Sequence, residues 1–566
     1  MGISDYFTTP SKDYSFIKKQ YKKNKRIETI PQNSFPVKCH NGTFVGKEKE
    51  NIISYKGIPF AKPPIKNLRW KPPVECDNSN DIFEAYCIEK SPVQTICPGE
   101  IASNYETGED CLYLNIWKNN DNEKNKPVMV FIHGGAFGWG GTSDLLYEGF
   151  NFVKNHKDII LVTIAYRVGM MGFIDLTQIK GGENYKASPN LGLLDQIQAL
   201  KWINKNIENF GGDKNNVTIF GESAGASSVT ILPLIKGSKG LFKRIISQSG
   251  SFAWAITRDE GKILIDEIKS EIKKERKEEI DMDYLLNLSE EEIINLNERV
   301  DHSIYAPMRD GYIIPEDCYG EVERGAYDGI DVMIGSNADE MRYFICEYGS
   351  YFIFSIGFRL FLENILYYRI KKKGYELFSE YEKCVKDAKS NFLNDLLFRS
   401  PALKLAQLHS KNNGNAYLYY WTYPSSIPYF GACHAVELAY IFNNLHVDIF
   451  IGDKNINYKL AEISQNMWAN FAKSGNPSTK DCKWEKYDEK NNYYMVLGKE
   501  VELKKNLFNK KRDELILPIL DQYISYNYMD LSYNVPMVRK AIFIILALFG
   551  VIISVLLNKY LTKQTT

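Results

Sequence analysis

Short apolar runs rich in β-branched residues recur along the middle of this chain, and segments typical of helices, such as residues 191–210, separate several of them. The runs cover residues 128–132, 159–166, 217–220, 244–247, 332–334 and 416–422. Strands that alternate with helices form a mostly parallel sheet covered by helices on both faces. The sequence therefore predicts an α/β fold, in which chemistry occurs just beyond the carboxyl ends of the strands.

The composition is that of a globular protein. Of 566 residues, 44% are hydrophobic and 25% are charged, which is ample for a large core. Because 70 Lys and Arg residues balance 70 Asp and Glu residues, nucleic acid is not expected as a partner. No Pro/Gly/Ser-rich linker or repeat divides residues 36–520, so we expect them to form one domain.

The two ends differ from the middle of the chain. Residues 1–35 form a basic tail without the apolar region of a secretory signal. Residues 541–557 are uncharged, so we predict a transmembrane helix over residues 541–560, preceded by a juxtamembrane segment over residues 521–540. The flanking charges do not fix its orientation. Without a signal peptide, the expected location is a membrane, with the large domain in the cytosol.

The stretch FGESAGASSV, residues 220–229, places Ser223 between two glycines directly after a predicted strand. A serine hydroxyl is a weak nucleophile, so it must stand on a sharp strand-to-helix turn within reach of a base. The small residues Gly221, Gly225 and Ala226 suit such a turn, and an apolar helix is expected to follow over residues 227–234. The pattern predicts that Ser223 is the nucleophile of an acyl-transfer reaction.

Acyl transfer also requires donors for the oxyanion that forms in the transition state. The segment HGGAF, residues 133–137, follows a predicted strand and supplies a glycine turn with available backbone N–H groups. We expect the donors to be the amides of Gly134 and Gly135, together with that of Ala224, the residue after the nucleophile.

Further motifs occur in a fixed order between about residue 36 and residue 510. They are YKGIPFAKPP (55–64), EDCLYLNIW (109–117), NLGLLDQIQALKWINKNIENFGGD (190–213), ISQSGS (246–251), GSNADE (335–340), CHAVEL (433–438) and FAKSGNPS (471–478). With GESAG and HGGAF, they make the chain resemble the type-B carboxylesterase/cholinesterase family of α/β-hydrolases. The resemblance implies a Ser-His-Glu triad and a small-molecule carboxylic ester as substrate, with no cofactor and no metal.

The resemblance assigns the remaining triad residues one by one. The acid matches Glu340 in GSNADE, and the base matches His434 in CHAVEL. His434 would take the proton of Ser223 and return it to the leaving alcohol, while Glu340 would fix the imidazole tautomer and stabilise its cation. Glu222 resembles the family's second acid beside the nucleophile and is expected to order water or substrate. The other histidines lack a comparable flanking pattern: His40, His156, His302, His409 and His446.

The chain also departs from the family's pattern. Met341 stands after the triad acid, where the family usually has glycine. The family's first disulfide implies a bridge between Cys111 and an upstream cysteine, for which Cys87 fits better than Cys97 by position. The second family loop, residues 250–300, contains no cysteine, and a charged helical stretch over residues 260–279 occupies it.

Two alternatives to a general carboxylesterase remain open. Cholinesterases place a tryptophan between the first two cysteines to hold choline, whereas this chain has Tyr105 as the aromatic residue there, which disfavours a cholinesterase. Membrane-anchored adhesion relatives have typically lost triad residues, whereas this chain keeps all three. The sequence therefore predicts a serine carboxylic-ester hydrolase that forms an acyl-enzyme, with a non-catalytic adhesion protein as the alternative. The natural ester and the oligomeric state are left open.

Overall fold

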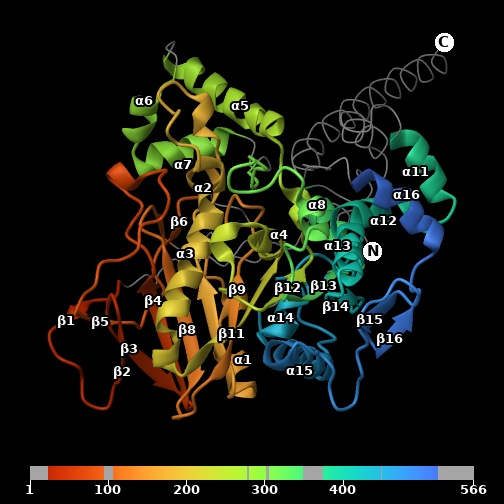
Figure 1. Cartoon of the computed structure of the whole chain (residues 1–566), viewed down its shortest axis with the longest axis horizontal. Helices are drawn as coiled ribbons and strands as arrows, with labels where there is room; N and C mark the ends of the chain where they lie inside the picture. The colour runs from red at the N-terminus through yellow and green to blue at the C-terminus, as the bar shows by residue number, and fades with distance from the viewer. Residues whose placement is uncertain are drawn as a thin grey trace, which may run out of the picture.

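The computed structural model describes residues 23–94, 106–276, 280–300, 305–348, 374–447 and 449–520. A 14-stranded sheet runs through the molecule (Figure 1). Its middle strands are parallel to one another: β10 (Ile160–Ile164), β9 (Lys126–Ile132), β11 (Gly212–Glu222), β12 (Arg244–Gln248), β13 (Asp331–Asn337), β14 (Ala416–Trp421) and β15 (Tyr493–Leu497). Every predicted strand lies in this set, so the expectation of a mostly parallel α/β sheet is confirmed.

Antiparallel strands extend the sheet at both ends. At one end β8 (Tyr113–Asn119) pairs with β10, and β4 (Ile52–Pro59) pairs with β8. At the other end β16 (Val501–Lys505) pairs with β15. The outermost strands at the first end are β3 (Gly42–Lys49), β2 (Phe35–Cys39), β5 (Ile82–Glu84) and β1 (Arg26–Ile27). A separate pair joins β6 (Ser91–Pro92) and β7 (Thr107–Gly108).

The sheet separates two hydrophobic cores because successive side chains of a strand point to opposite faces. In β9, Val128 and Val130 belong to one core, whereas Met129 and Phe131 belong to the other. Helix α3 (Leu191–Asn206) contributes to the first core, and α15 (Tyr458–Ser474) contributes to the second. The central strands are thus covered on both faces, which explains why their sequences are apolar without alternation.

Helix α3, together with the turn that follows it, has the bounds that the sequence predicts. A 3₁₀ turn over Ile207–Phe210 continues it, so together they fill the predicted helical stretch 191–210. The pair ends at Gly211, whose φ of 92° is the left-handed conformation that favours glycine.

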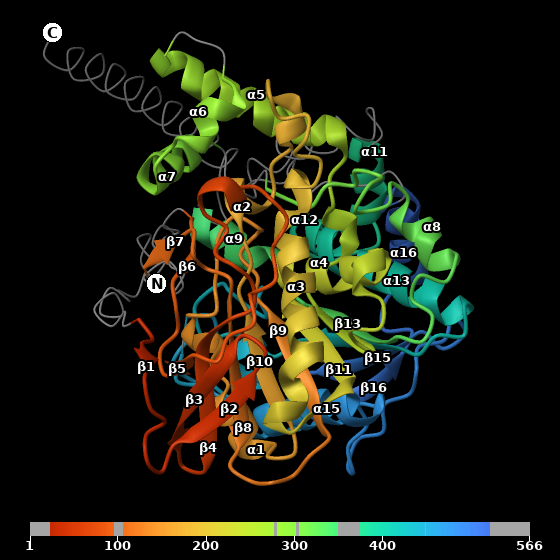
Figure 2. The same cartoon turned by 60° about the vertical axis from the view of Figure 1, so that its left-hand side comes forward.

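Helices α5 (Arg258–Arg276), α6 (Met282–Leu286) and α7 (Glu290–Arg299) lie together at one end of the molecule, at the top of Figure 2. Helix α5 occupies the charged stretch predicted to be helical. A smaller third core, which includes Trp254 and Met341, joins helices from the second half of the chain. They are α9 (Met341–Tyr348), α11 (Gly374–Glu382), α12 (Ala388–Asn394) and α16 (Lys510–Leu520).

The remaining helices complete the layers around the sheet. They are α1 (Phe150–Asn155), α2 (Gly169–Gly172), α4 (Ala224–Ile231), α8 (Cys318–Glu323), α13 (Ser400–Lys411) and α14 (Leu438–Ile441).

The predicted membrane anchor requires a correction. Within the described ranges, which end at residue 520, no helix has both the length and the apolar character needed to cross a bilayer. The prediction of a fold with a transmembrane helix, and of a membrane location derived from it, is therefore wrong for the structure as described. The prediction rested on the hydropathy of residues 541–560, and these residues lie outside the described ones.

Candidate active site

Ser223 occupies the turn between strand β11 and helix α4, as the sequence predicts. Its φ of 57° and ψ of −122° are strained for a residue with a side chain, at a cost of about 1–3 kcal/mol. Two backbone hydrogen bonds hold the turn: the Ser223 amide donates to the Gln248 carbonyl at 2.8 Å, and the Ser223 carbonyl accepts from the Ser227 amide at 2.9 Å. The strain is therefore maintained by the neighbouring strand and by the first turn of the helix.

The glycines around Ser223 are required by close packing. A Cβ atom added to Gly225 would lie 1.9 Å from the carbonyl oxygen of Ile132, and one added to Gly250 would lie 2.3 Å from that of Ser223. Neither position can accept a side chain without moving backbone. The start of α4 therefore packs directly against the end of β9, and this contact brings the HGGAF turn beside Ser223.

The HGGAF turn follows β9 and lies against Ser223. Gly135 has a φ of 100°, and a Cβ atom added to Gly134 would lie 3.1 Å from the Cβ of Ser223 and 2.9 Å from Oε2 of Glu222. Ala224 is the first residue of α4, where backbone N–H groups lack partners within the helix. Gly134 and Ala224, two of the predicted oxyanion donors, thus lie beside Ser223, and Gly135 follows Gly134 in the same turn.

His133 in the same turn has a structural role. Its Nδ1 lies 2.8 Å from the Gly134 carbonyl oxygen, and its ring stacks on Tyr166 at 4.3 Å between centroids. Burial lowers the pKa of His133 to about 4, so this imidazole is neutral near pH 7.

His434 lies between two carboxylates. It follows β14 in the chain, and its Nδ1 lies 2.6 Å from Oε2 of Glu340, which follows β13. Its Nε2 lies 3.1 Å from Oε1 of Glu222. All three side chains are buried. Residues that stand 94 positions apart in the sequence are thus brought into one hydrogen bond beside the Ser223 turn.

The surroundings of His434 favour its charged form. Burial alone lowers its pKa, but the negative charges of Glu222, Glu340 and Glu437 outweigh burial and raise that pKa to about 9. His434 therefore differs from His133 in charge at neutral pH. Of these two buried histidines, His434 is the one that can exchange a proton near the working pH of an enzyme.

Behind the pair lies a buried network whose role the sequence did not assign. Oε1 of Glu340 accepts from the Asn337 amide at 2.6 Å, and the Asn337 side chain donates to Glu437 at 2.6 Å. Gln248 donates to the other oxygen of Glu437 at 3.1 Å. Burial and the charge of Glu340 raise the pKa of Glu437. These residues stand in the motifs GSNADE, CHAVEL and ISQSGS, so the motifs could have indicated that they lie near the site.

Two aromatic rings flank the imidazole of His434. The centroids of Phe344 and Phe398 each lie 5.1 Å from that of His434. Phe398 in turn meets the edge of Trp254 at 5.4 Å. These contacts could not be predicted from the sequence, because neither Phe344 nor Phe398 stands in one of the motifs.

The two departures from the family's pattern have clear structural outcomes. Met341 begins helix α9 and is buried in the third core, while its amide donates to the Asn394 side chain at 2.9 Å. Glu340 is thus held without a glycine after it. Cys111 is a buried free thiol, and burial raises its pKa well above the ordinary value. The predicted bridge between Cys87 and Cys111 is therefore not formed in the structure.

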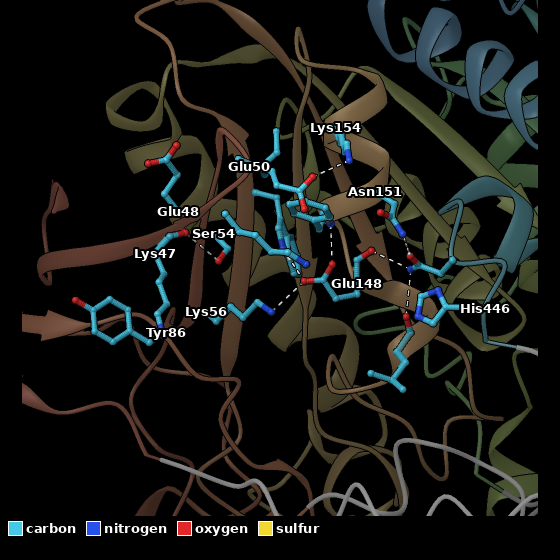
Figure 3. Close-up of a pocket in the computed structure, with 16 residues that line it drawn as sticks. Lys47, Glu48, Glu50, Ser54, Lys56, Tyr86, Glu148, Asn151, Lys154 and His446 are labelled. Atoms are coloured by element: carbon cyan, nitrogen blue, oxygen red, sulfur yellow. Dashed lines mark hydrogen bonds and ion pairs between the residues drawn. The ribbon is translucent and has the colours of Figure 1, made fainter. Parts of the chain in front are cut away.

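A separate surface pocket of about 590 Å³ is lined by β3, β4, α1 and nearby loops. Figure 3 shows two of its lysines facing glutamates: Lys56 lies 3.0 Å from Glu148, and Lys154 lies 2.8 Å from Glu50. His446 lines the same pocket. In the described ranges, no group of three or more His, Cys, Asp or Glu side chains is arranged to hold a metal ion.

A serine on a strained turn after a parallel strand, with a buried histidine–carboxylate pair at the same edge of the sheet, is the arrangement typical of an α/β-hydrolase. Comparison with known proteins makes the class specific. Residues 33–515 match the model of the carboxylesterase family, and the chain belongs to this family. The protein is a carboxylesterase-type hydrolase.

Relatives and solved structures agree with this assignment. The para-nitrobenzyl esterase of Bacillus subtilis is 31% identical over 492 residues, covering 84% of this chain and 97% of the relative. A cholinesterase of Mus musculus is 30% identical, covering 81% of each chain. Among solved structures, the carboxylesterase EST55 of Geobacillus stearothermophilus is similar with a TM-score of 0.75 and 29% identity, covering 85% of this chain and 99% of that chain.

Proposed function

We propose that the protein hydrolyses small carboxylic esters through an acyl-enzyme on Ser223, with His434 as general base and acid and Glu340 as the residue that orients it. The observation that carries this proposal is the 2.6 Å contact between His434 and Glu340 beside a strained serine turn. A buried carboxylate on Nδ1 keeps a proton there, so Nε2 is the nitrogen that accepts the Ser223 proton when His434 is in its neutral form.

Acylation begins when Oγ of Ser223 attacks the ester carbonyl carbon and His434 accepts the hydroxyl proton. The carbonyl oxygen becomes an oxyanion, which the amides of Gly134, Gly135 and Ala224 stabilise by hydrogen bonds. The bond to the alkoxy oxygen then breaks, and His434 returns the proton to the leaving alcohol. The acyl group remains on Ser223.

Deacylation repeats these steps with water. His434 accepts a proton from the attacking water molecule, a second oxyanion forms in the same place, and the acid leaves as the proton returns to Ser223. Glu222 lies 3.1 Å from Nε2 of His434, so its role is to stabilise the imidazolium and to orient the water. No step requires a metal or a cofactor.

Neither alternative, an adhesion protein or a cholinesterase, is favoured by these observations. The match to the carboxylesterase family and the esterase relatives favour hydrolysis over adhesion. A relative is a cholinesterase, but the argument from Tyr105 still disfavours choline esters, and residue 105 lies outside the described ranges.

The test compares the full-length protein with its Ser223→Ala variant on p-nitrophenyl acetate, butyrate and octanoate, and on acetylcholine. We expect hydrolysis of the p-nitrophenyl esters and a loss of roughly 10⁴-fold or more in kcat in the variant. Activity that survives in Ser223→Ala would overturn the assignment of the nucleophile. A folded wild-type protein without activity would favour adhesion, and a preference for acetylcholine would favour a cholinesterase.

A further inference from the structure

A single π turn separates helices α12 and α13, and the sequence explains why it forms. Over Asp395–Arg399 the helix widens, and the amide of Ser400 donates to the carbonyl of Asp395, five residues earlier. The next residue is Pro401, which has no N–H group to offer the Leu397 carbonyl four residues before it. That carbonyl accepts instead from Nε1 of Trp254 at 2.9 Å. The π turn is therefore fixed by a proline on one side and a distant indole on the other.

The π turn directs its side chains to two different places. Phe398 lies against the imidazole of His434, with 5.1 Å between ring centroids. Asp395 and Arg399 instead enter a buried ion cluster, in which Nε of Arg399 donates to Asp395 at 2.6 Å. Single π turns inside helices occur frequently at functional sites. Here the turn connects a charged cluster to the ring that touches the proposed catalytic base.

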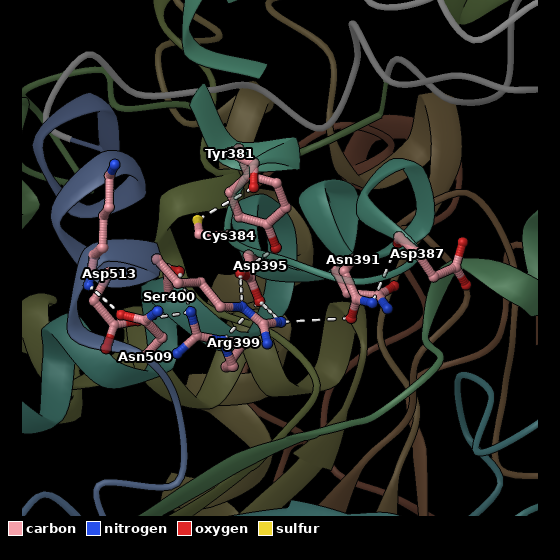
Figure 4. A network of polar contacts seen from close by, with 12 residues as sticks. Tyr381, Cys384, Asp387, Asn391, Asp395, Arg399, Ser400, Asn509 and Asp513 are labelled. Carbon is pink, nitrogen blue, oxygen red and sulfur yellow. Dashed lines mark hydrogen bonds and ion pairs between the residues drawn. The ribbon is translucent and has the colours of Figure 1, made fainter. Parts of the chain in front are cut away.

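The ion cluster consists of Asp395, Arg399, Arg512 and Asp513, of which Figure 4 labels Asp395, Arg399 and Asp513. Arg512 of helix α16 donates to both carboxylate oxygens of Asp395, the Nη2 contact being 2.6 Å long. Arg399 reaches Asp513 of the same helix at 2.7 Å. Both guanidinium groups also lie over the ring of Phe508, at 4.3 Å and 4.6 Å. Helix α16 is thus held to the π turn by paired charges, and both arginines of these pairs also contact the ring of Phe508.

The residue before the π turn contacts the segment that carries the proposed triad acid. The side chain of Asn394 accepts from the Met341 amide and donates to the Ala338 carbonyl, each at 2.9 Å. These two residues flank the segment that holds Glu340. The same short stretch of chain therefore contacts the surroundings of both the acid and the base.

We propose that the π turn over Asp395–Arg399 is a positioning element for His434, and that the ion cluster with Arg512 and Asp513 holds this turn in place. Docking of α16 then sets the position of Phe398, and Phe398 restricts the tilt of the imidazole. The proposal rests on the proposed function, because it assigns a role relative to the catalytic base. Arg512 and Phe398 are positioning residues, since neither exchanges a proton with the substrate.

The test is a double-mutant cycle with Phe398→Leu and Arg512→Gln in the full-length protein. The substrate is p-nitrophenyl acetate, and kcat is divided by the concentration of sites that a fluorophosphonate labels, so that unfolded protein does not count. We expect each single variant to lose roughly 5–10-fold in kcat with little change in KM, and the double variant to lose no more than Phe398→Leu alone, because coupled residues are not additive. Lys510→Gln, on the same helix with a side chain 90% exposed, is the matched control and keeps the wild-type kcat.

Several outcomes would overturn the proposal. If Arg512→Gln lowers the melting temperature but keeps the wild-type kcat per labelled site, the cluster only stabilises the fold. If the two losses multiply in the double variant, Arg512 does not act through Phe398. Should Arg512→Gln fail to fold, Asp513→Asn, which removes one contact at the edge of the cluster, replaces it in the same cycle. Wild-type protein that is neither labelled nor active would instead refute the proposed function itself.

Discussion

Two buried groups of charges lie near the π turn, and they are built differently. Around His434, Glu222 and Glu340 contact one imidazole, and Glu437 adds its negative charge without touching the ring. In the ion cluster of Asp395, Arg399, Arg512 and Asp513, two carboxylates meet two guanidinium groups. The first group carries more negative than positive charge, whereas the second is balanced.

The consequence of this difference is visible in the pKa values. Burial alone would raise the pKa of Asp395, but Arg399 and Arg512 outweigh burial and lower it to about 2. This carboxylate therefore stays ionised at any pH at which the protein works. Around His434 the excess of carboxylates moves the pKa of the imidazole to about 9, which leaves its proton exchangeable. A balanced cluster suits the stability of a fold, and an unbalanced one suits proton transfer.

The largest expected effect comes from removing the imidazole. His434→Ala should lose roughly 10⁴-fold or more in kcat, equivalent to about 5.5 kcal/mol, because His434 is the proposed acceptor of the Ser223 proton. Steady-state hydrolysis of p-nitrophenyl acetate measures the loss, and circular dichroism checks the fold. His446→Ala, in the separate pocket, is the matched histidine control and should keep full activity. A His434→Ala variant with about a tenth of wild-type kcat would exclude His434 as the base.

The next effect concerns stability and the ion cluster. Arg399→Met leaves Asp513 without its cation and Asp395 with Arg512 alone, so we expect the free energy of unfolding to fall by about 3–5 kcal/mol. Urea unfolding followed by tryptophan fluorescence measures the change. Arg324→Met is the control, because Arg324 pairs with Glu321 on the surface, and its loss should cost less than about 1 kcal/mol. Equal effects of the two substitutions would show that burial adds nothing to the cluster.

The stabilising contributions of His434 and Asp395 should be lost at opposite ends of the pH scale. The pKa of His434 is raised from 6.5 to about 9, so its stabilising contribution is present below pH 6.5 and is lost as pH rises through 9. The pKa of Asp395 is lowered from 3.8 to about 2, so its contribution is present above pH 3.8 and is lost as pH falls through 2. The alkaline loss should be on the order of a few kcal/mol.

Urea unfolding of wild type and His434→Ala across these two windows tests the assignment. Subtracting the curve of the variant isolates His434 from buried tyrosines, which also ionise at alkaline pH. The difference between the two proteins should shrink between pH 6.5 and 9 and stay constant in the acid window. A difference that does not change with pH would show that His434 is not charged in the folded protein.

How much of these regions can be predicted from the sequence depends on how far apart in the chain the contacting residues stand. The parallel strands, α3 and the Ser223 turn depend on local periodicity and on small residues, so all of them could be predicted. The π turn could not, because Pro401 creates a free carbonyl whose donor, Trp254, stands 143 residues away from Leu397. The partner of Asp395 on α16 is 117 residues away. The membrane anchor was argued from hydropathy alone, which says nothing about packing.

The smallest expected effect comes from removing one negative charge beside His434. Among the groups that raise its pKa, Glu222 contributes most. Glu222→Gln keeps the shape of the side chain and removes the charge, so the pKa of His434 should move from about 9 toward 6.5. The rise of kcat/KM with pH should therefore occur at lower pH than in the wild type, because His434 loses its proton at lower pH.

At neutral pH the change in kcat/KM should stay below about tenfold, since a larger free fraction of the base is offset by the lost stabilisation of the imidazolium. Glu148→Gln is the matched control: Glu148 pairs with Lys56 in the separate pocket, and its variant should have the wild-type pH profile. An unchanged profile in Glu222→Gln would mean that Glu340 and Glu437 set the charge of His434 without Glu222. The excess of carboxylates around His434 would then stabilise the fold, as the ion cluster does. The difference in charge between the two groups would not explain why only one of them takes part in catalysis.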